Sequence, residues 1–225
     1  MRTYKTYGYE DTHIVRDSLE KLASERINKY DYREAFLTIG KELGRVILHK
    51  LPDNYKVSTL LACASEDADW LAKGVMDGLE SDNLPIAVFW TKRFHLGNVD
   101  ISPIIKSYQD EVEGTCETLI IVKSIISSSC VVKTQLLRLI SRFTPKQIFI
   151  VAPVMYKDAE KNLIHEFPKD ISEKFSFITF AIDDEIKENV IIPGIGGWVY
   201  PRLGFENEEI KNRYIPHIVL ERMAL

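Results

Sequence analysis

Apolar residues recur at helical spacing in two segments near the start of the chain. They return every three or four residues over 13–30, and again over 36–47. This spacing places them on one face of a helix, so two amphipathic helices are predicted. Asp11 or Thr12 is a candidate cap for the first helix, and Asp31 is a candidate cap for the second.

Beyond these helices the pattern changes to short, continuous apolar runs separated by helical stretches. The runs are rich in branched residues and lie at 57–64, 86–90, 118–122, 147–151 and 175–180. The helical stretches lie at 70–79, 131–143 and 157–167. Continuous apolar strands that alternate with helices are typical of a parallel sheet covered on both faces. The predicted fold class is α/β, with a mainly parallel sheet flanked by helices and an N-terminal helical layer.

Two segments do not fit either pattern. Residues 1–11 are polar and rich in tyrosine, and an irregular arm is expected there. Residues 92–116 are polar and irregular, and they are long enough to be a functional loop or flap. Ligands of parallel sheets bind beyond the carboxyl ends of the strands. That rule selects four segments for inspection: 64–70, 91–98, 123–130 and 191–204.

Composition excludes several classes of protein. The 225 residues suit one domain, predicted to span 1–225. A net charge of -4 argues against general nucleic-acid binding through a basic surface. The apolar runs are far shorter than the roughly 20 residues that a membrane helix needs, so no membrane association is expected. Three isolated cysteines and no signal-like N-terminus fit the cytoplasm.

The most specific motif lies near the end of the chain. Residues 181–186 read AIDDEI, and residues 190–197 read VIIPGIGG. They resemble the closing segment of the uracil phosphoribosyltransferase family, in which an AIDE strand end leads to a YIVPGLGDAGDR hood over the base. The order of elements upstream agrees, including a P…Y stretch at 103–108. The resemblance covers a core of 13–204 and implies a type I phosphoribosyltransferase-like fold, with 205–225 as a C-terminal extension.

The resemblance also implies a set of site residues. A phosphate would be held after the strand 118–122, by Ser127, Ser128, Ser129, Cys130 and Lys123. A base would lie against the hood, at Ile192, Gly194, Ile195 and Gly196. Contacts to a diphosphate or to its covering loop would come from Lys92, Arg93 and Arg202. The only cofactor implied is magnesium, accompanying a ligand like phosphoribosyl diphosphate (PRPP).

The chain departs from the family at its two anion loops. Lys123 stands where the family has an acid that contacts the ribose hydroxyls, so the charge is reversed. Glu66, Asp67 and Asp69 occupy the loop in which the family uses an arginine on the diphosphate. Ser129 replaces a glycine that lets backbone amides approach a phosphate. A degenerate PRPP motif of this kind predicts little or no uracil phosphoribosyltransferase activity.

Each candidate has a simpler interpretation. Serines 127–129 either hold a phosphate or cap the helix that follows. The Pro-Gly segment at 193–197 is either a backbone wall for a base or an ordinary turn. The acidic residues 66–69 either hold magnesium or begin a helix, where negative charge is favourable. The helix start is favoured for the acidic residues.

The predicted function is therefore a uracil phosphoribosyltransferase-like protein, related to pyrimidine salvage, that binds a nucleobase, nucleotide or ribosyl phosphate. The alternative is a non-catalytic regulatory or assembly component that uses the fold for protein contacts. A third reading is an active transferase with a changed donor or base, its acids supplied by residues 65–69. A dimer or other homo-oligomer, or a partner protein bound through the tail 205–225, is also expected.

Overall fold

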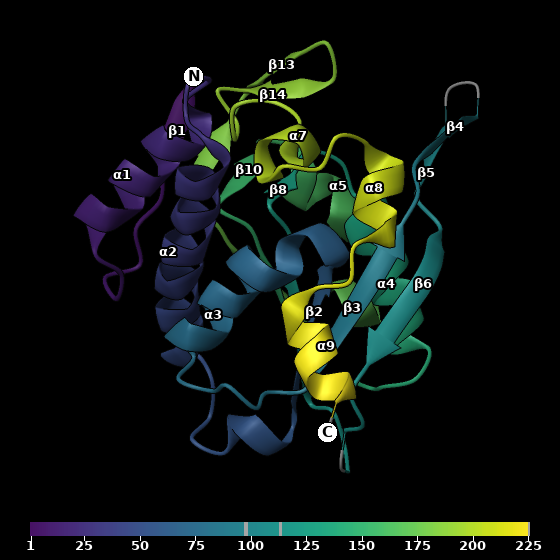
Figure 1. Ribbon diagram of the computed structural model, residues 1–225. Helices are drawn as coiled ribbons and strands as arrows, with labels where there is room; N and C mark the ends of the chain where they lie inside the picture. Colours follow the sequence, from purple (N-terminus) through teal and green to yellow (C-terminus); the bar gives the residue numbers. More distant parts are fainter. Residues whose placement is uncertain (97–98, 113, 225) are drawn as a thin grey trace.

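A six-stranded sheet forms the centre of the protein, seen in a computed structural model that describes residues 1–96, 99–112 and 114–224 (Figure 1). The strand order is β11-β9-β7-β2-β3-β6. All neighbouring pairs are parallel except β3 and β6. The strands are β2 Thr59–Ala64, β3 Ile86–Thr91, β6 Ile104–Gln109, β7 Thr118–Val122, β9 Gln147–Val151 and β11 Phe175–Ile178. The predicted α/β fold with a mainly parallel sheet is confirmed.

Helices cover both faces of this sheet. Alternate strand residues point to opposite sides, and each side has its own core. One core packs against α1 Thr12–Ala23, α2 Lys29–Leu48 and α3 Lys73–Gly78. The other packs against α4 Cys130–Ile140, α5 Ala159–His165 and α6 Lys169–Ser172. Burial on both faces explains why the strand segments are continuously apolar in the sequence.

A second, smaller sheet lies beyond the carboxyl ends of the central strands. Its order is β1-β12-β10-β8, with bounds β1 Arg2–Tyr4, β12 Ala181–Asp183, β10 Val154–Tyr156 and β8 Ile125–Ile126. Three of these strands follow β7, β9 and β11 almost directly, so the small sheet continues the large one (Figure 1). The hairpin β13 Glu185–Lys187 and β14 Val190–Ile192 projects from it.

The C-terminal extension packs on the domain itself. It follows α7 Val199–Leu203 and contains α8 Glu208–Arg213 and α9 His217–Met223. The carboxylate of Asp69 accepts hydrogen bonds from the backbone nitrogens of His217 (2.8 Å) and Ile218 (3.0 Å), at the start of α9. The indole nitrogen of Trp90 donates to the carbonyl oxygen of Tyr214 over 2.8 Å. Asp69 and β3 therefore anchor the extension beside the loop that follows β2.

Two glycine pairs allow α2 and α3 to cross closely. Gly40 and Gly44 of α2 face Gly74 and Gly78 of α3. A Cβ atom at Gly78 would overlap the backbone oxygen of Lys41 and lie 2.9 Å from the Cα of Gly44. Only hydrogen atoms fit between the two backbones at this crossing. The π-helical turn Ala68–Ala72, which leads into α3, also packs against α2.

The boundary between the first two helices differs from the prediction. The predicted helix over 13–30 ends at Ala23, and α2 begins at Lys29. The side-chain oxygen of Asn28 accepts from the nitrogens of Tyr30 and Asp31, so Asn28 is the cap in place of Asp31. Asp11 caps α1, as expected.

The two segments expected to be irregular contain strands. Residues 2–4 form β1, which pairs antiparallel with β12. The segment 92–116 contains β4 Phe94–Leu96, β5 Val99–Ile101 and the edge strand β6, while residues 97–98 and 113 lie outside the described part. An edge strand is exposed to solvent and carries polar residues, so its composition does not identify it as a strand. None of the helices in the described ranges has the length and hydropathy required to cross a membrane.

Candidate functional site

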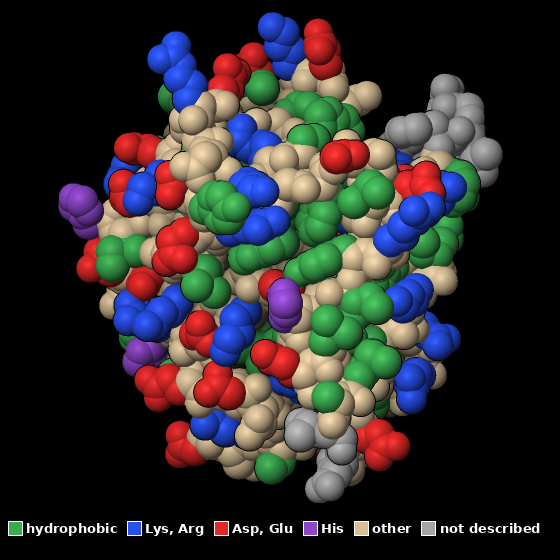
Figure 2. Space-filling model, viewed as in Figure 1, with side chains coloured by type: hydrophobic (Ala, Val, Ile, Leu, Met, Phe, Trp, Pro, Cys, Tyr) green, Lys and Arg blue, Asp and Glu red, His purple; other side chains and the backbone are tan. Residues whose placement is uncertain are grey.

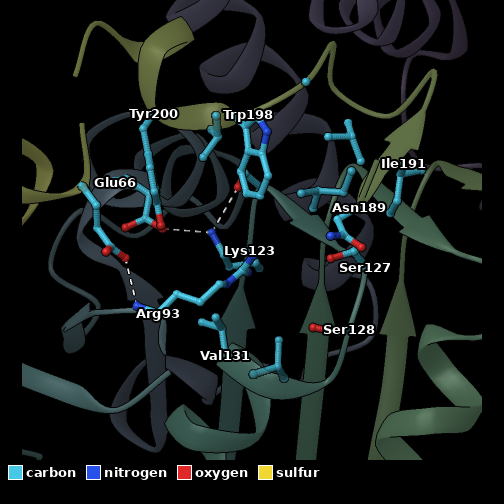
Figure 3. Close-up of a pocket in the computed structure, with 17 residues that line it drawn as sticks. Glu66, Arg93, Lys123, Ser127, Ser128, Val131, Asn189, Ile191, Trp198 and Tyr200 are labelled. Atoms are coloured by element: carbon cyan, nitrogen blue, oxygen red, sulfur yellow. Dashed lines mark hydrogen bonds and ion pairs between the residues drawn. The ribbon is translucent and has the colours of Figure 1, made fainter. Parts of the chain in front are cut away.

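One cavity lies where the sheet topology predicts a crevice. After β2 the chain adds β3 on one side and later β7 on the other, so the loops that follow β2 and β7 diverge. Between them is a cavity of about 310 Å³ (Figure 3). Its walls come from the loops after β2, β3 and β7, from the β13–β14 turn and from residues 197–200.

Part of the predicted phosphate loop faces this cavity. Ser127 and Ser128 line it, whereas Ser129 and Cys130 line a neighbouring depression with Ser128. The Ser129 hydroxyl donates to Glu166 over 3.2 Å, and no side-chain hydrogen bond caps α4. The hydrogen bond that would support the interpretation of these serines as helix caps is therefore not formed. Their role in phosphate binding stays a prediction.

Lys123 points into the protein interior at the inner end of the cavity. Its ammonium lies 2.7 Å from a carboxylate oxygen of Asp67, 3.1 Å from one of Glu66, and 3.1 Å from the hydroxyl of Ser124. Burial alone would lower the pKa of this lysine, but the two carboxylates outweigh burial and raise its pKa well above the ordinary value. Lys123 is thus charged, and its charge is already matched by protein groups.

A second buried lysine completes this cluster from the C-terminal extension. Lys211 of α8 is fully buried, donates to the carbonyl oxygen of Thr91 over 2.9 Å, and lies 3.7 Å from Glu66. The pKa of Glu66 is lowered, because Lys123 and Lys211 together outweigh the opposing effect of burial. We call Glu66, Asp67, Lys123 and Lys211 the ion cluster. Two positive and two negative groups make it neutral.

The acidic loop does not fit the magnesium site considered from the sequence. Glu66 and Asp67 are bound to lysine, and Asp69 is bound to the backbone at the start of α9 and to the hydroxyl of Tyr214. Within the ranges that the structure describes, no group of three or more histidine, cysteine, aspartate or glutamate side chains is placed to hold a metal ion. These carboxylates stabilise the fold through ion pairs with lysine and hydrogen bonds to Tyr214 and the start of α9.

Arg93 is a second cation that lines the cavity. Its side chain extends from the end of β3 into the cavity, below Lys123 (Figure 3). Its backbone nitrogen donates to Glu208 over 2.9 Å, and its guanidinium carbon lies 5.9 Å from the ring centre of Trp198. In the described part of the chain, no carboxylate forms an ion pair with this guanidinium. Lys92, by contrast, is exposed and does not line the cavity.

The backbone of the predicted base wall is occupied within the protein. The nitrogen of Gly194 donates to Asp183 (2.9 Å), and its carbonyl oxygen accepts from Arg2 (2.6 Å). The carbonyl oxygen of Ile195 accepts from the hydroxyl of Tyr32 over 3.0 Å. These bonds tie the segment to the N-terminal strand and to α2, away from the cavity.

Arg202 has a similar structural role. It donates to the carbonyl oxygens of Gly196 (2.7 Å), Leu22 (3.3 Å) and Ser24 (2.5 Å), and it does not line the cavity. The four residues predicted to contact a base, Ile192, Gly194, Ile195 and Gly196, do not line it either. Their base-binding role stays a prediction without support from this placement.

Other residues of the same segment face the cavity and were missed from the sequence. They are Asn189, Val190, Ile191, Trp198, Val199 and Tyr200, with Glu208 from α8. They flank the PGIGG motif on both sides. Two features of the sequence could have indicated these residues. One is an aromatic residue directly after paired glycines, and the other is an asparagine in a turn. Gly197, which belongs to the predicted wall, lines the cavity as well.

Comparison with solved structures places this fold among known ones. The AQ2163 protein from Aquifex aeolicus aligns with 88% of this chain and 98% of its own, at 13% identity and a TM-score of 0.69. A hypoxanthine phosphoribosyltransferase from Staphylococcus aureus aligns with 59% of this chain and 67% of its own (17% identity, TM-score 0.40). For an orotate phosphoribosyltransferase from Aeropyrum pernix the shares are 63% and 68% (11% identity, TM-score 0.36).

These likenesses concern the fold. The solved structures that align include type I phosphoribosyltransferases, and they do not single out the uracil family. No protein-family model matches the chain, and no curated protein matches it.

Proposed function

We propose that the cavity binds a nucleotide or a related nucleobase or ribosyl phosphate, and that the chain does not carry out PRPP-dependent transfer. The observation that carries this proposal is the combination of Arg93, Ser127 and Ser128 in one cavity beside the start of α4. A guanidinium, hydroxyls and a helix N-terminus are groups that bind phosphate. The cavity also lies at the topological switch point, where doubly wound sheets bind such ligands.

The ion cluster supports the second half of the proposal. Transfer of a ribosyl phosphate develops positive charge on the sugar while diphosphate leaves, so it needs acids near the ribose and positive charge near the diphosphate. Here a charged lysine replaces the ribose acid, and the carboxylates on the diphosphate side are bound to lysines. Binding is retained in this arrangement, whereas the electrostatic requirements of transfer are not met.

A thermal-shift panel tests the proposal directly. The panel contains uracil, uridine and guanosine monophosphates, ribose 5-phosphate, and PRPP with and without magnesium. A ligand at a hundred times its dissociation constant should stabilise the protein by about 2.7 kcal/mol. PRPP with magnesium and uracil should give no turnover; a rate of roughly 1 per second or more, ordinary for an enzyme, would contradict the proposal.

A charge placed in the phosphate loop should abolish binding of phosphorylated ligands. Ser128→Asp puts a carboxylate on the exposed rim of the cavity, where it repels a phosphate. We expect at least a tenfold loss of affinity for ribose 5-phosphate in calorimetry, equal to about 1.4 kcal/mol. Ser141→Asp, at the exposed far end of α4, makes the same change of net charge and should leave affinity unchanged. Equal affinity in both variants would show that the loop does not hold the phosphate.

The second candidate is a non-catalytic regulatory or assembly component, in the cytoplasm, that dimerises or binds a protein through its tail. Leu220 and Met223 of α9 are 46% and 65% exposed, which favours a contact there. Figure 2 shows acidic and basic side chains interspersed on the face that carries α9, and no continuous basic area there. Light scattering of the intact protein and of Leu220→Lys separates the two candidates: a dimer lost in the variant supports the assembly role.

A further inference from the structure

We propose that Trp198 and Asn189 form a ring-binding subsite, so that the ligand of the cavity carries a planar heteroaromatic ring recognised by side chains. This inference rests on the proposed function and adds to it the part of the site that contacts the base. In this proposal the base is recognised by the side chains of Trp198 and Asn189, not by the backbone of residues 193–197 as predicted from the sequence.

Most polar backbone groups at the centre of the PGIGG segment are already hydrogen-bonded within the protein. Both polar backbone groups of Gly194 and both of Gly196 are hydrogen-bonded within the protein, as is the carbonyl of Ile195. A base that used them would have to displace Arg2, Asp183, Tyr32 or Arg202. Side chains that face the cavity are therefore better placed to recognise a ring than the backbone of residues 194–196.

Trp198 is exposed although it belongs to a tightly packed domain. Its side chain lines the cavity and is 53% exposed, whereas Trp90 is 1% exposed and Trp70 packs against the core. Packing does not require an exposed tryptophan at this position. Figure 3 shows its indole among the residues that line the cavity, and the guanidinium carbon of Arg93 lies 5.9 Å from the ring centre. Aromatic faces of this kind stack on nucleobases with little dependence on which base is bound.

Asn189 lines the same cavity as Trp198. It occupies the turn between β13 and β14 at a φ of 64°, a left-handed conformation that asparagine tolerates. Turn geometry alone therefore explains an asparagine here, but not the direction of its side chain, which points into the cavity near Ser127 (Figure 3). A carboxamide offers one acceptor and two donor hydrogens, which suits the mixed donor and acceptor edge of a nucleobase.

The two subsites are adjacent, as a nucleotide requires. Arg93 reaches the cavity from β3, and its guanidinium lies 5.9 Å from the Trp198 ring. Ser127 and Ser128 line the opposite wall. A phosphate bound between Arg93 and these serines leaves its attached ring next to Trp198 and Asn189. A sugar phosphate without a base would contact only the first subsite.

Tryptophan fluorescence provides a readout that a purely structural role would not change. Uridine and guanosine monophosphates should quench the emission of the exposed Trp198, and ribose 5-phosphate should bind without quenching. Trp198→Ala should weaken nucleotide binding roughly tenfold, because base stacking is lost. It should leave ribose 5-phosphate affinity within about twofold. Trp198→Phe keeps an aromatic face and should restore most of the affinity.

The matched variant at the turn is Asn189→Gly, since glycine accepts the left-handed backbone and removes only the carboxamide. It should weaken nucleotide binding and leave ribose 5-phosphate binding unchanged. Nucleotide affinity that is unaffected by Trp198→Ala would overturn the subsite and leave the proposed function standing. No binding by nucleotides or by ribose 5-phosphate would overturn both.

Discussion

Replacing Lys123 with methionine is expected to lower the free energy of unfolding by about 3–5 kcal/mol. The substitution leaves the carboxylates of Glu66 and Asp67 buried, with Lys211 as the remaining cation of the ion cluster. An uncompensated buried charge is among the most destabilising changes in a protein. For a chain of this size the melting temperature should fall by roughly 6–20 °C. Urea denaturation followed by circular dichroism measures the difference.

Two controls separate burial from the loss of a positive charge. Lys133→Met removes a lysine from a partly exposed ion pair with Glu166, and it should cost less than about 1 kcal/mol. Adding Asp67→Asn to Lys123→Met should recover part of the loss, because Glu66 and Lys211 then remain as one pair of opposite buried charges. A cost for Lys123→Met no larger than that of Lys133→Met would contradict the account of the ion cluster.

Gly78→Ala should destabilise the protein by about 2–3 kcal/mol, in the upper range for overpacking. The new methyl group would overlap the carbonyl oxygen of Lys41 and would lie 2.9 Å from the backbone nitrogen of Arg45. Backbone atoms cannot move aside as a flexible side chain can, so α2 and α3 must separate. The cost of this overlap would exceed the gain of up to about 1 kcal/mol that alanine usually gives over glycine inside a helix. Thermal and urea unfolding report the change.

The matched control for Gly78→Ala is the adjacent Asp77→Ala. Asp77 lies on the solvent side of α3, where it pairs with Lys73 in the next turn back. Its removal should cost no more than about 0.5 kcal/mol, the value of such a helix-surface pair. A neutral or stabilising Gly78→Ala would mean that the helices separate without cost.

Long strands buried on both faces could be predicted from the sequence, whereas short strands could not. The runs at 118–122 and 147–151 match β7 and β9 residue for residue. By contrast, β8, β10 and β12 have two or three residues each and form through pairing with distant strands. Local pattern carries no information about such partners. The turn into α2 was also missed, because an asparagine and an aspartate three residues apart are both good caps.

The site could be predicted in part. Lys123, Arg93, Ser127 and Ser128 were candidates, and the structure brings them to one cavity. Pairing of Lys123 with acids 56 and 57 positions away depends on the order of β2 and β7 in the sheet. The sequence nevertheless contained an indication of this pairing. In each of the two loops, the charge is opposite to the one that the family resemblance implies. One loop gains a positive charge and the loop of the neighbouring strand gains negative charges. Considered together, these two changes predict an ion pair between the loops.

The pairing of β1 with β12 has a consequence for how the chain folds as it is synthesised. Arg2 lies opposite Asp183, so 180 residues separate the partners, and the contact cannot form until nearly the whole chain has emerged. Closing so long a loop is slow compared with forming local helices. Because Arg2 and Asp183 also fix Gly194, the wall beside the cavity is completed only after the strands of the central sheet have been synthesised. A nascent chain therefore contains the central sheet before it contains a finished binding site.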